Sequence, residues 1–99
     1  MALTDNQKKH LRRLGHALNP VVLVGQRGPT PNVIAELARA LHDHELVKVR
    51  ARVGDREQRD AVLAGLAAAT GSELAFQIGN VGLFYKKNNM LNKILIPDS

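Results

Sequence analysis

Residues 21–31 read Val-Val-Leu-Val-Gly-Gln-Arg-Gly-Pro-Thr-Pro, and they contain signals for a strand, a loop and a helix start in succession. The unbroken apolar run Val21–Val24 predicts a short strand that is buried on both faces. Thr30 and Pro31 are typical of a helix N-terminus, with threonine as the N-cap and proline at the first helical position. The loop Gly25–Gly28 is therefore expected to direct backbone N–H groups and the positive end of a helix dipole to one place, where phosphates bind.

The loop itself carries a further positive group, because Arg27 lies near its tip. A tight turn between a strand and a helix also needs glycine to reach positive φ, and many such loops bind no ligand. We therefore treat Gly25, Gln26, Arg27 and Gly28 as candidate phosphate contacts. The support for this interpretation depends on the charge of the surrounding residues.

Length and composition predict a single small domain. The chain has 99 residues, enough for one hydrophobic core, and its lack of cysteine excludes disulfides and thiolate chemistry. No apolar run is long enough for a bilayer, and the N-terminus lacks the features of a signal peptide. We expect a cytoplasmic protein with one domain over residues 1–99, in which residues 88–99 form a partly ordered tail.

The charge of the chain is positive and unevenly distributed. The net charge is +5 and the isoelectric point is about 10.1. Residues 30–45 and 55–70 together have a net charge of −3, whereas the rest of the chain has +8. A one-sided basic surface is typical of proteins that bind polyanions.

The N-terminal segment predicts a basic amphipathic helix. Thr4 and Gln7 fit a capping box, and the helix should run to about Leu14 or Leu18. At 100° per residue, Leu11, Leu14 and Leu18 fall on one side. The opposite side carries Lys8, Lys9, Arg12, Arg13 and His16. With no carboxylate interleaved beyond the first turn, this side is a candidate polyanion contact.

A second row of cations is expected on a strand over residues 46–53, after a helix from Pro31 to about Asp43. Apolar residues alternate there with Lys48, Arg50 and Arg52, which would lie on one face at a spacing of about 6.6–6.8 Å. Three cations in a row need a face that is open to water. Such a row could follow a phosphate backbone.

The remaining sequence predicts a third helix and a hairpin. Asp55 with Gln58 forms a second capping box, Gly71 ends the helix, and Gly65 in its middle suggests close packing on the sheet. Leu74, Phe76 and Ile78 alternate, Gly79 and Asn80 form the turn, and Val81, Leu83 and Tyr85 alternate again. Lys86 and Lys87 close the last strand.

The predicted element order is α-β-α-β-α-β-β, which defines a single α/β domain. Positive groups recur at the first helix, the glycine loop, the second strand and the end of the last strand. Whether they share one face depends on the strand order, which the sequence does not provide.

Several motifs resemble the CRM-domain family (chloroplast RNA splicing and ribosome maturation) in its stand-alone bacterial, YhbY-type form. They span residues 14–20, the strand and loop 21–28, residues 44–49 (His-Glu-Leu-Val-Lys-Val) and residues 83–85 (Leu-Phe-Tyr). The resemblance implies a four-stranded mixed sheet with three helices, similar to the C-terminal domain of translation initiation factor three. It also implies a GxxG loop like that of KH domains.

The same resemblance implies a function in ribosome assembly. The implied partner is rRNA in a precursor of the large ribosomal subunit, and no cofactor, metal, membrane or small-molecule substrate is expected. The implied RNA contacts are the GxxG loop and the basic first helix, residues 8–13. Relatives commonly have tyrosine and then arginine where this chain has Tyr85 and Lys86, so the planar guanidinium is lost there.

The composition also predicts how RNA would be held. The chain has three aromatic residues, and we expect Phe76 and Phe84 in the core, which leaves no stacking platform. Binding should then be directed mainly at phosphates and depend steeply on salt. We expect a monomer.

Other functions have weaker support in the sequence. His42, Asp43 and His44 lie where a helix should end, where they are better explained by the helix dipole than by catalysis or metal binding. No nucleophile motif is present, so we do not expect an enzyme. An alternative is a protein-interaction module that presents the basic face to an acidic protein. DNA binding is less favoured, because no helix-turn-helix spacing is evident.

Overall fold

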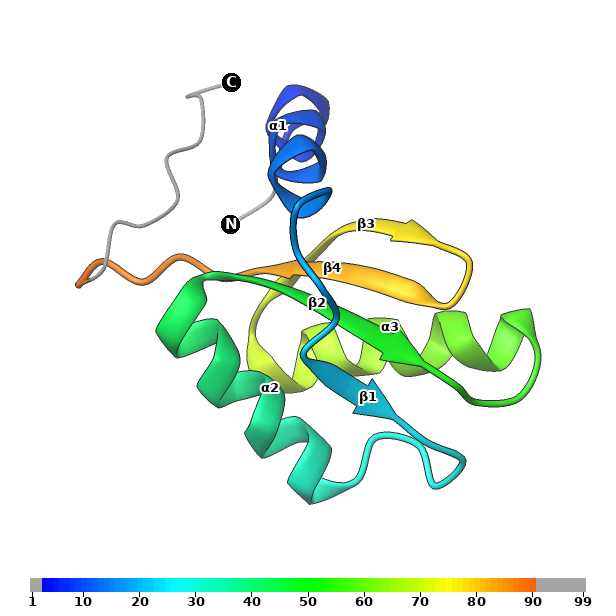
Figure 1. Ribbon diagram of the computed structural model, residues 1–99. Coiled ribbons are helices and arrows are strands. Elements are labelled where there is room, and N and C mark those ends of the chain that lie inside the picture. Colours follow the sequence, from blue (N-terminus) through cyan, green and yellow to red (C-terminus); the bar gives the residue numbers. More distant parts are fainter. Residues whose placement is uncertain (1–2, 91–99) are drawn as a thin grey trace.

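The computed structural model describes residues 3–90, and it contains three helices and one sheet in the predicted order (Figure 1). The elements are α1 (Asp5–Gly15), β1 (Val22–Val24), α2 (Pro31–His44), β2 (Leu46–Ala51), α3 (Arg56–Thr70), β3 (Glu73–Ile78) and β4 (Val81–Tyr85). The α/β class and the element order are therefore confirmed. The predicted tail lies partly in residues 91–99, outside the described residues.

The sheet is mixed, with the strand order β1-β2-β4-β3. β1 and β2 are parallel and are joined through α2, whereas β4 is antiparallel to both of its neighbours. α1 lies on one face of the sheet, and α2 and α3 lie on the other (Figure 1). The four-stranded mixed sheet implied by the family resemblance is thus present.

The larger part of the core lies between the sheet and the helices α2 and α3. It follows from the alternation in β2, where Val47, Val49 and Ala51 are buried on that face. Lys48 and Arg50 alternate with them and must therefore lie on the face that carries α1. A smaller cluster under α1 contains Leu3, Leu11, Leu46, Ala75, Leu83 and Tyr85.

The local signals for helix ends are confirmed. Thr4 and Asp55 each form the predicted capping box, and the Thr30 side chain accepts a hydrogen bond from the Val33 N–H. Gly71 ends α3 in the left-handed conformation, with φ of 68°. Each N-cap contributes about 1 kcal/mol, since it satisfies backbone donors that have no partner in the helix.

Two expectations about the N-terminal half were wrong. Val21 and Leu23 are each 58% exposed, so the first strand is buried on one face rather than on both. It is an edge strand, and the face carrying Leu23 lies beyond the cover of α1. Helix α1 ends at Gly15, close to Leu14 as predicted, but Leu14 and Leu18 are 38% and 36% exposed instead of docking the helix.

The contact that docks α1 includes a glycine, which the spacing of leucines could not reveal. Gly15 is buried against Leu83, and a Cβ at this position would lie 2.7 Å from a Leu83 methyl carbon. The helix therefore rests on Gln7, Leu11 and Gly15, which are four residues apart and share one side of the helix. Leu14 is displaced to the rim of this contact.

Two expectations about the C-terminal half were also wrong. A register shift between Leu74 and Phe76 places Leu74 against the larger core and leaves Phe76 on the α1 face, only partly buried. A β-bulge of this kind reverses the alternation of side chains along a strand. Gly65 is exposed and has open space around it, so it does not mark close packing on the sheet.

Within the part of the chain that the structure describes, none of the helices is both long and apolar enough to cross a bilayer.

Candidate nucleic-acid interface

The GxxG loop projects from the end of β1 as a closed turn. The Gly28 N–H donates to the Gly25 carbonyl oxygen at 2.9 Å, and Gly28 has a φ of 74°, a conformation that favours glycine. Gln26 and Arg27 at the tip are exposed. Open space surrounds both glycines, so a ligand can approach the loop backbone closely.

The parallel pairing of β1 and β2 brings this loop to the end of the cationic strand. The Arg52 N–H donates to the Val24 carbonyl oxygen at 2.8 Å, just beyond the end of β2. The Gln26 side-chain amide donates to the Arg52 carbonyl oxygen at 3.2 Å, which fixes the loop against the strand. The loop and the cations of β2 therefore form one structural unit.

The row Lys48, Arg50 and Arg52 lies on the sheet face that carries α1, as the alternation predicts, but β2 ends at Ala51 rather than at residue 53, so Arg52 lies just beyond the strand. Lys48 and Arg50 are partly buried, whereas Arg52 is exposed. The Lys48 ammonium donates to the Leu18 carbonyl oxygen at 3.1 Å, which ties the segment after α1 to the middle of β2. Lys48 thus joins the row on β2 to the end of α1.

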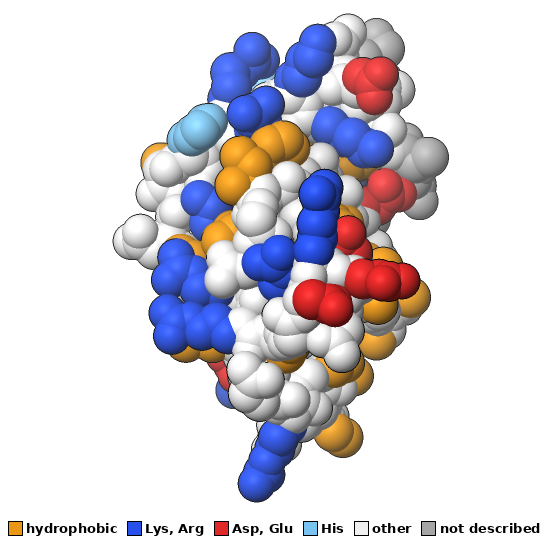
Figure 2. Space-filling view, turned by 90° about the vertical axis from the view of Figure 1, so that its right-hand side faces the viewer, with side chains coloured by type: hydrophobic (Ala, Val, Ile, Leu, Met, Phe, Trp, Pro, Cys, Tyr) orange, Lys and Arg blue, Asp and Glu red, His pale blue; other side chains and the backbone are white. Residues whose placement is uncertain are grey.

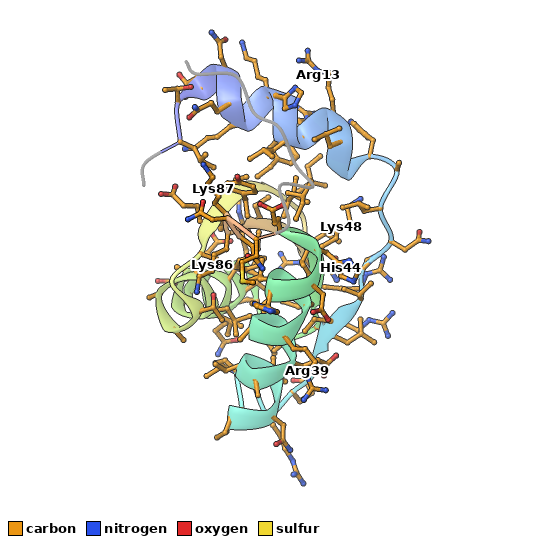
Figure 3. The ribbon with its side chains drawn as sticks, turned by 90° about the vertical axis from the view of Figure 1, so that its left-hand side faces the viewer. Arg13, Arg39, His44, Lys48, Lys86 and Lys87 are labelled. Atoms are coloured by element: carbon orange, nitrogen blue, oxygen red, sulfur yellow. The ribbon has the colours of Figure 1, made fainter. Side chains whose placement is uncertain are left out.

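The basic residues of α1 occupy different positions around the helix. Lys9, Arg12, Arg13 and His16 are exposed and Lys8 is partly buried. Arg13 projects from the outer side of the helix, away from the sheet (Figure 3). The Arg12 guanidinium carbon lies 4.2 Å from the centroid of the Phe76 ring, in the geometry of a cation–π contact.

We call these three groups together the basic surface. It comprises the loop Gly25, Gln26, Arg27 and Gly28, the row Lys48, Arg50 and Arg52, and the helix residues Lys8, Lys9, Arg12 and Arg13. Basic side chains extend from the helix at the top of Figure 2 to the opposite end of the molecule, while acidic ones gather to one side. The strand order thus brings together positive groups from distant parts of the sequence.

Lys86 and Lys87 lie apart from the GxxG loop. Tyr85, which precedes them, pairs with Leu46 at the start of β2, whereas the loop lies beside the other end of that strand. The Lys86 ammonium donates to the Thr70 carbonyl oxygen at 2.8 Å and so caps the C-terminus of α3. Lys87 is exposed, and both lysines lie near the end of α2 in Figure 3.

A groove beside the loop was not evident in the sequence. It has a volume of about 410 Å³ and lies between the GxxG loop and the start of α3. Gln26, Arg27 and Gly28 line one side, and Gly54, Gln58 and Ala61 line the other. Only the packing of α3 beside β1 and β2 creates it, and no local pattern signals that packing.

The histidine cluster at the end of α2 has a structural environment. The Asn88 side-chain amide donates to the His42 carbonyl oxygen at 2.7 Å, which holds the chain after β4 against the helix. Over residues 3–90, no three histidine, aspartate or glutamate side chains are grouped so that they could hold a metal ion.

Tyr85 and Glu45 form a buried polar pair at the same end of the sheet. Burial, and then the nearby Glu45 carboxylate, raise the pKa of the Tyr85 hydroxyl above its ordinary value of 10.0. Glu45 is also buried, and its carboxylate accepts a hydrogen bond from the Asn88 N–H at 2.9 Å. This pair links β4 to the turn between α2 and β2, away from the basic surface.

The fold and its motifs correspond to one domain family. The sequence model of the CRS1 / YhbY (CRM) domain matches residues 3–86, and the chain belongs to this family. The resemblance found in the sequence is therefore confirmed.

Two relatives of this chain are small proteins of nearly the same length. A Pseudomonas aeruginosa protein named "Probable RNA-binding protein" is 47% identical over 95 residues, which cover 96% of this chain and 91% of that protein. A Haemophilus influenzae RNA-binding protein is 36% identical over 95 residues, which cover 96% of this chain and 95% of that protein.

A solved structure supports the same assignment. The solution structure of a hypothetical Staphylococcus aureus protein, described as a candidate RNA-binding protein, superposes with a TM-score of 0.85. The two chains are 30% identical, and the match covers 97% of this chain and 100% of the Staphylococcus aureus chain. The family and these relatives are described by domain and by RNA binding, and none of them is described as an enzyme.

Proposed function

We propose that this protein binds RNA through the basic surface. One observation carries the proposal: the GxxG loop and the cationic row of β2 meet at one end of the sheet, where Gln26 is hydrogen-bonded to the Arg52 backbone at 3.2 Å. Backbone N–H groups, a helix dipole and full charges then act on the same stretch of phosphates. The description of the relatives as RNA-binding proteins supports RNA as the polyanion.

In this proposal the parts of the basic surface have different roles. The loop approaches a phosphate closely, because neither glycine carries a side chain and open space surrounds both. The row on β2 and the cations of α1 contact phosphates further along the chain. Such contacts fix the position of the RNA and carry little sequence information.

We further propose that the RNA is rRNA in a precursor of the large ribosomal subunit, bound by a monomer in the cytoplasm. The membership of the CRM family, whose name refers to ribosome maturation, supports this role. It is tested by sedimenting a lysate of the native host through a sucrose gradient, with and without RNase. The protein should migrate with large-subunit precursors at low salt, and RNase treatment should release it.

The contact itself is tested with Arg27→Glu, which reverses the charge at the loop tip. Arg27 is exposed, so the variant should fold like the wild type and bind RNA at least tenfold more weakly. Arg39→Glu is the matched control, because Arg39 is exposed on α2, which covers the other face of the sheet (Figure 3). Equal affinity of the folded Arg27 and Arg39 variants would contradict the proposed role of the loop.

The gradient also separates RNA binding from the alternative, an acidic protein partner. A large complex that survives RNase but dissociates in salt would favour a protein partner on the same surface. Migration near the top of the gradient at every salt concentration would contradict the ribosomal role. The affinities of the Arg27 and Arg39 variants for RNA would then test RNA binding itself.

A further inference from the structure

A small hollow opens on the sheet face that carries α1, next to the basic surface. Its volume is about 240 Å³, below the range of about 300–1,000 Å³ typical of pockets for drug-sized ligands. The lining residues come from α1, the segment after it, and three strands: Arg12, Gly15, His16, Lys48, Phe76, Ile78, Val81 and Leu83. A hollow of this size suits one flat ring system rather than a larger molecule.

The hollow has an apolar floor and a cationic rim. Ile78 and Val81 face each other across the β3–β4 hairpin, and Ile78 is 59% exposed. Phe76 and Leu83 form the next pair on the same face. Arg12 and Lys48 stand at the rim, so a ligand with apolar faces and polar edges would match the hollow.

Arg12 is already arranged for stacking. Its guanidinium carbon lies 4.2 Å from the centroid of the Phe76 ring, and the residue is exposed. A guanidinium supported by a ring can present its free face to a second planar group, and RNA bases stack on guanidinium planes.

We propose that this hollow binds one unpaired RNA base, which rests on Ile78 and Val81 and stacks with the Arg12 guanidinium, itself supported by the Phe76 ring. The proposal rests on the proposed function and adds a base contact to surfaces that otherwise meet phosphates. Arg50 pairs with Val81 in the register of β2 and β4. The backbone of the nucleotide in the hollow can therefore continue along the cationic row toward the GxxG loop.

The base must be unpaired for a physical reason. In an RNA duplex, the faces of each base are covered by its stacked neighbours, and only its edges can be reached. A base that lies flat on the floor of the hollow must have left such a stack. The protein would thereby favour single-stranded loops or bulges over a regular helix.

The test uses two oligomers with the same number of phosphates: an oligouridylate, and an oligomer of equal length built from abasic ribose units. Phe76→Leu keeps an apolar side chain and removes the aromatic ring that supports the Arg12 guanidinium. It should weaken binding of the oligouridylate about fivefold or more, with unchanged affinity for the abasic oligomer. Ile78→Ser should have the same selective effect, and its exposed position keeps the fold intact if Phe76→Leu proves unstable.

Arg12→Gln and Arg13→Gln provide a matched pair, since both remove one positive charge from neighbouring positions of α1. Arg12→Gln should weaken binding of the oligouridylate more than Arg13→Gln does, and the two variants should bind the abasic oligomer equally. The proposal is overturned if the folded Ile78→Ser and Arg12→Gln variants lose as much affinity for the abasic oligomer as for the oligouridylate. It is also overturned if neither variant loses affinity for either oligomer. Wild-type protein that bound neither oligomer would instead refute the proposed function.

Discussion

The contribution of β2 to RNA binding can be predicted from the number of cations on its open face. Replacing Arg50 and Arg52 by glutamine removes two charges beside the GxxG loop. Each phosphate contact contributes about −0.9 to the slope of log K against log salt for a duplex, and about −0.7 for a single strand. The double variant should therefore flatten the slope by about 1.4–1.8.

Lys48 should contribute less to the slope than Arg50 or Arg52 does, because of its contacts in the structure. Its ammonium already donates to the Leu18 carbonyl oxygen at 3.1 Å, and the side chain is partly buried. Adding Lys48→Gln should therefore flatten the slope further by less than the value of about 0.7–0.9 for one full phosphate contact.

The assay is fluorescence anisotropy with a labelled RNA at salt concentrations from 50 to 200 mM. Over this range, the wild type should lose about 7- to 12-fold more affinity than the double variant does. Arg39→Gln is the control for removal of a surface charge, because Arg39 is exposed on α2, which covers the other face of the sheet (Figure 3). Equal slopes for the β2 variant and the control would refute the reasoning and remove β2 from the interface.

Three further predictions concern stability. Gly65→Ala should stabilise the protein by about 1 kcal/mol and raise Tm by about 4–8 °C, since the position is exposed, helical and surrounded by open space. Unchanged or lower Tm would contradict this. Lys86→Met should lower the free energy of unfolding by about 0.5–1.5 kcal/mol through loss of the bond to the Thr70 carbonyl, while RNA affinity stays at that of the Arg39→Gln control. A fall in affinity without a fall in stability would return Lys86 to the RNA site. The pKa of Tyr85 is raised in the folded protein, so its contribution to stability is complete below the unfolded pKa of about 10. This contribution is lost as the pH rises through the folded pKa. Above pH 10, Tyr85→Phe should therefore lose less stability than the wild type does. Absorbance titration of this single tyrosine should give a higher midpoint in the folded protein than in urea, and equal midpoints would contradict the burial argument.

The parts of the fold that were predictable from the sequence depend on neighbouring residues. The caps at Thr4, Thr30 and Asp55 each require one side chain and a backbone N–H three residues away. The face of the cations in β2 follows from strict alternation, and the hairpin follows from a two-residue turn at Gly79 and Asn80. These signals are complete within a few residues, so tertiary packing did not alter them.

The wrong predictions have a common cause, which is that they concern contacts between distant elements. Phe76 was expected in the core because a regular strand puts alternate residues on one face, and the shift after Leu74 breaks that rule. Gly65 suggested close packing, but a glycine in a helix can equally lie on the exposed side. No local pattern in this sequence predicts the bulge in β3 or the side of α3 on which Gly65 lies.

The arrangement of the candidate site follows from one topological choice that the sequence left open. If β1 paired antiparallel to β2, the GxxG loop would lie beside Leu46 and close to Lys86 and Lys87. The parallel pairing, with α2 as the crossover, instead places the loop beside Arg52 and leaves those lysines at the opposite end. Parallel strands joined by a helix end at the same edge of the sheet, so residues from separate parts of the sequence meet there. The same topology leaves the open face of the sheet continuous from the loop to the hollow under Arg12, which is why phosphate contacts and a base contact can belong to one RNA strand.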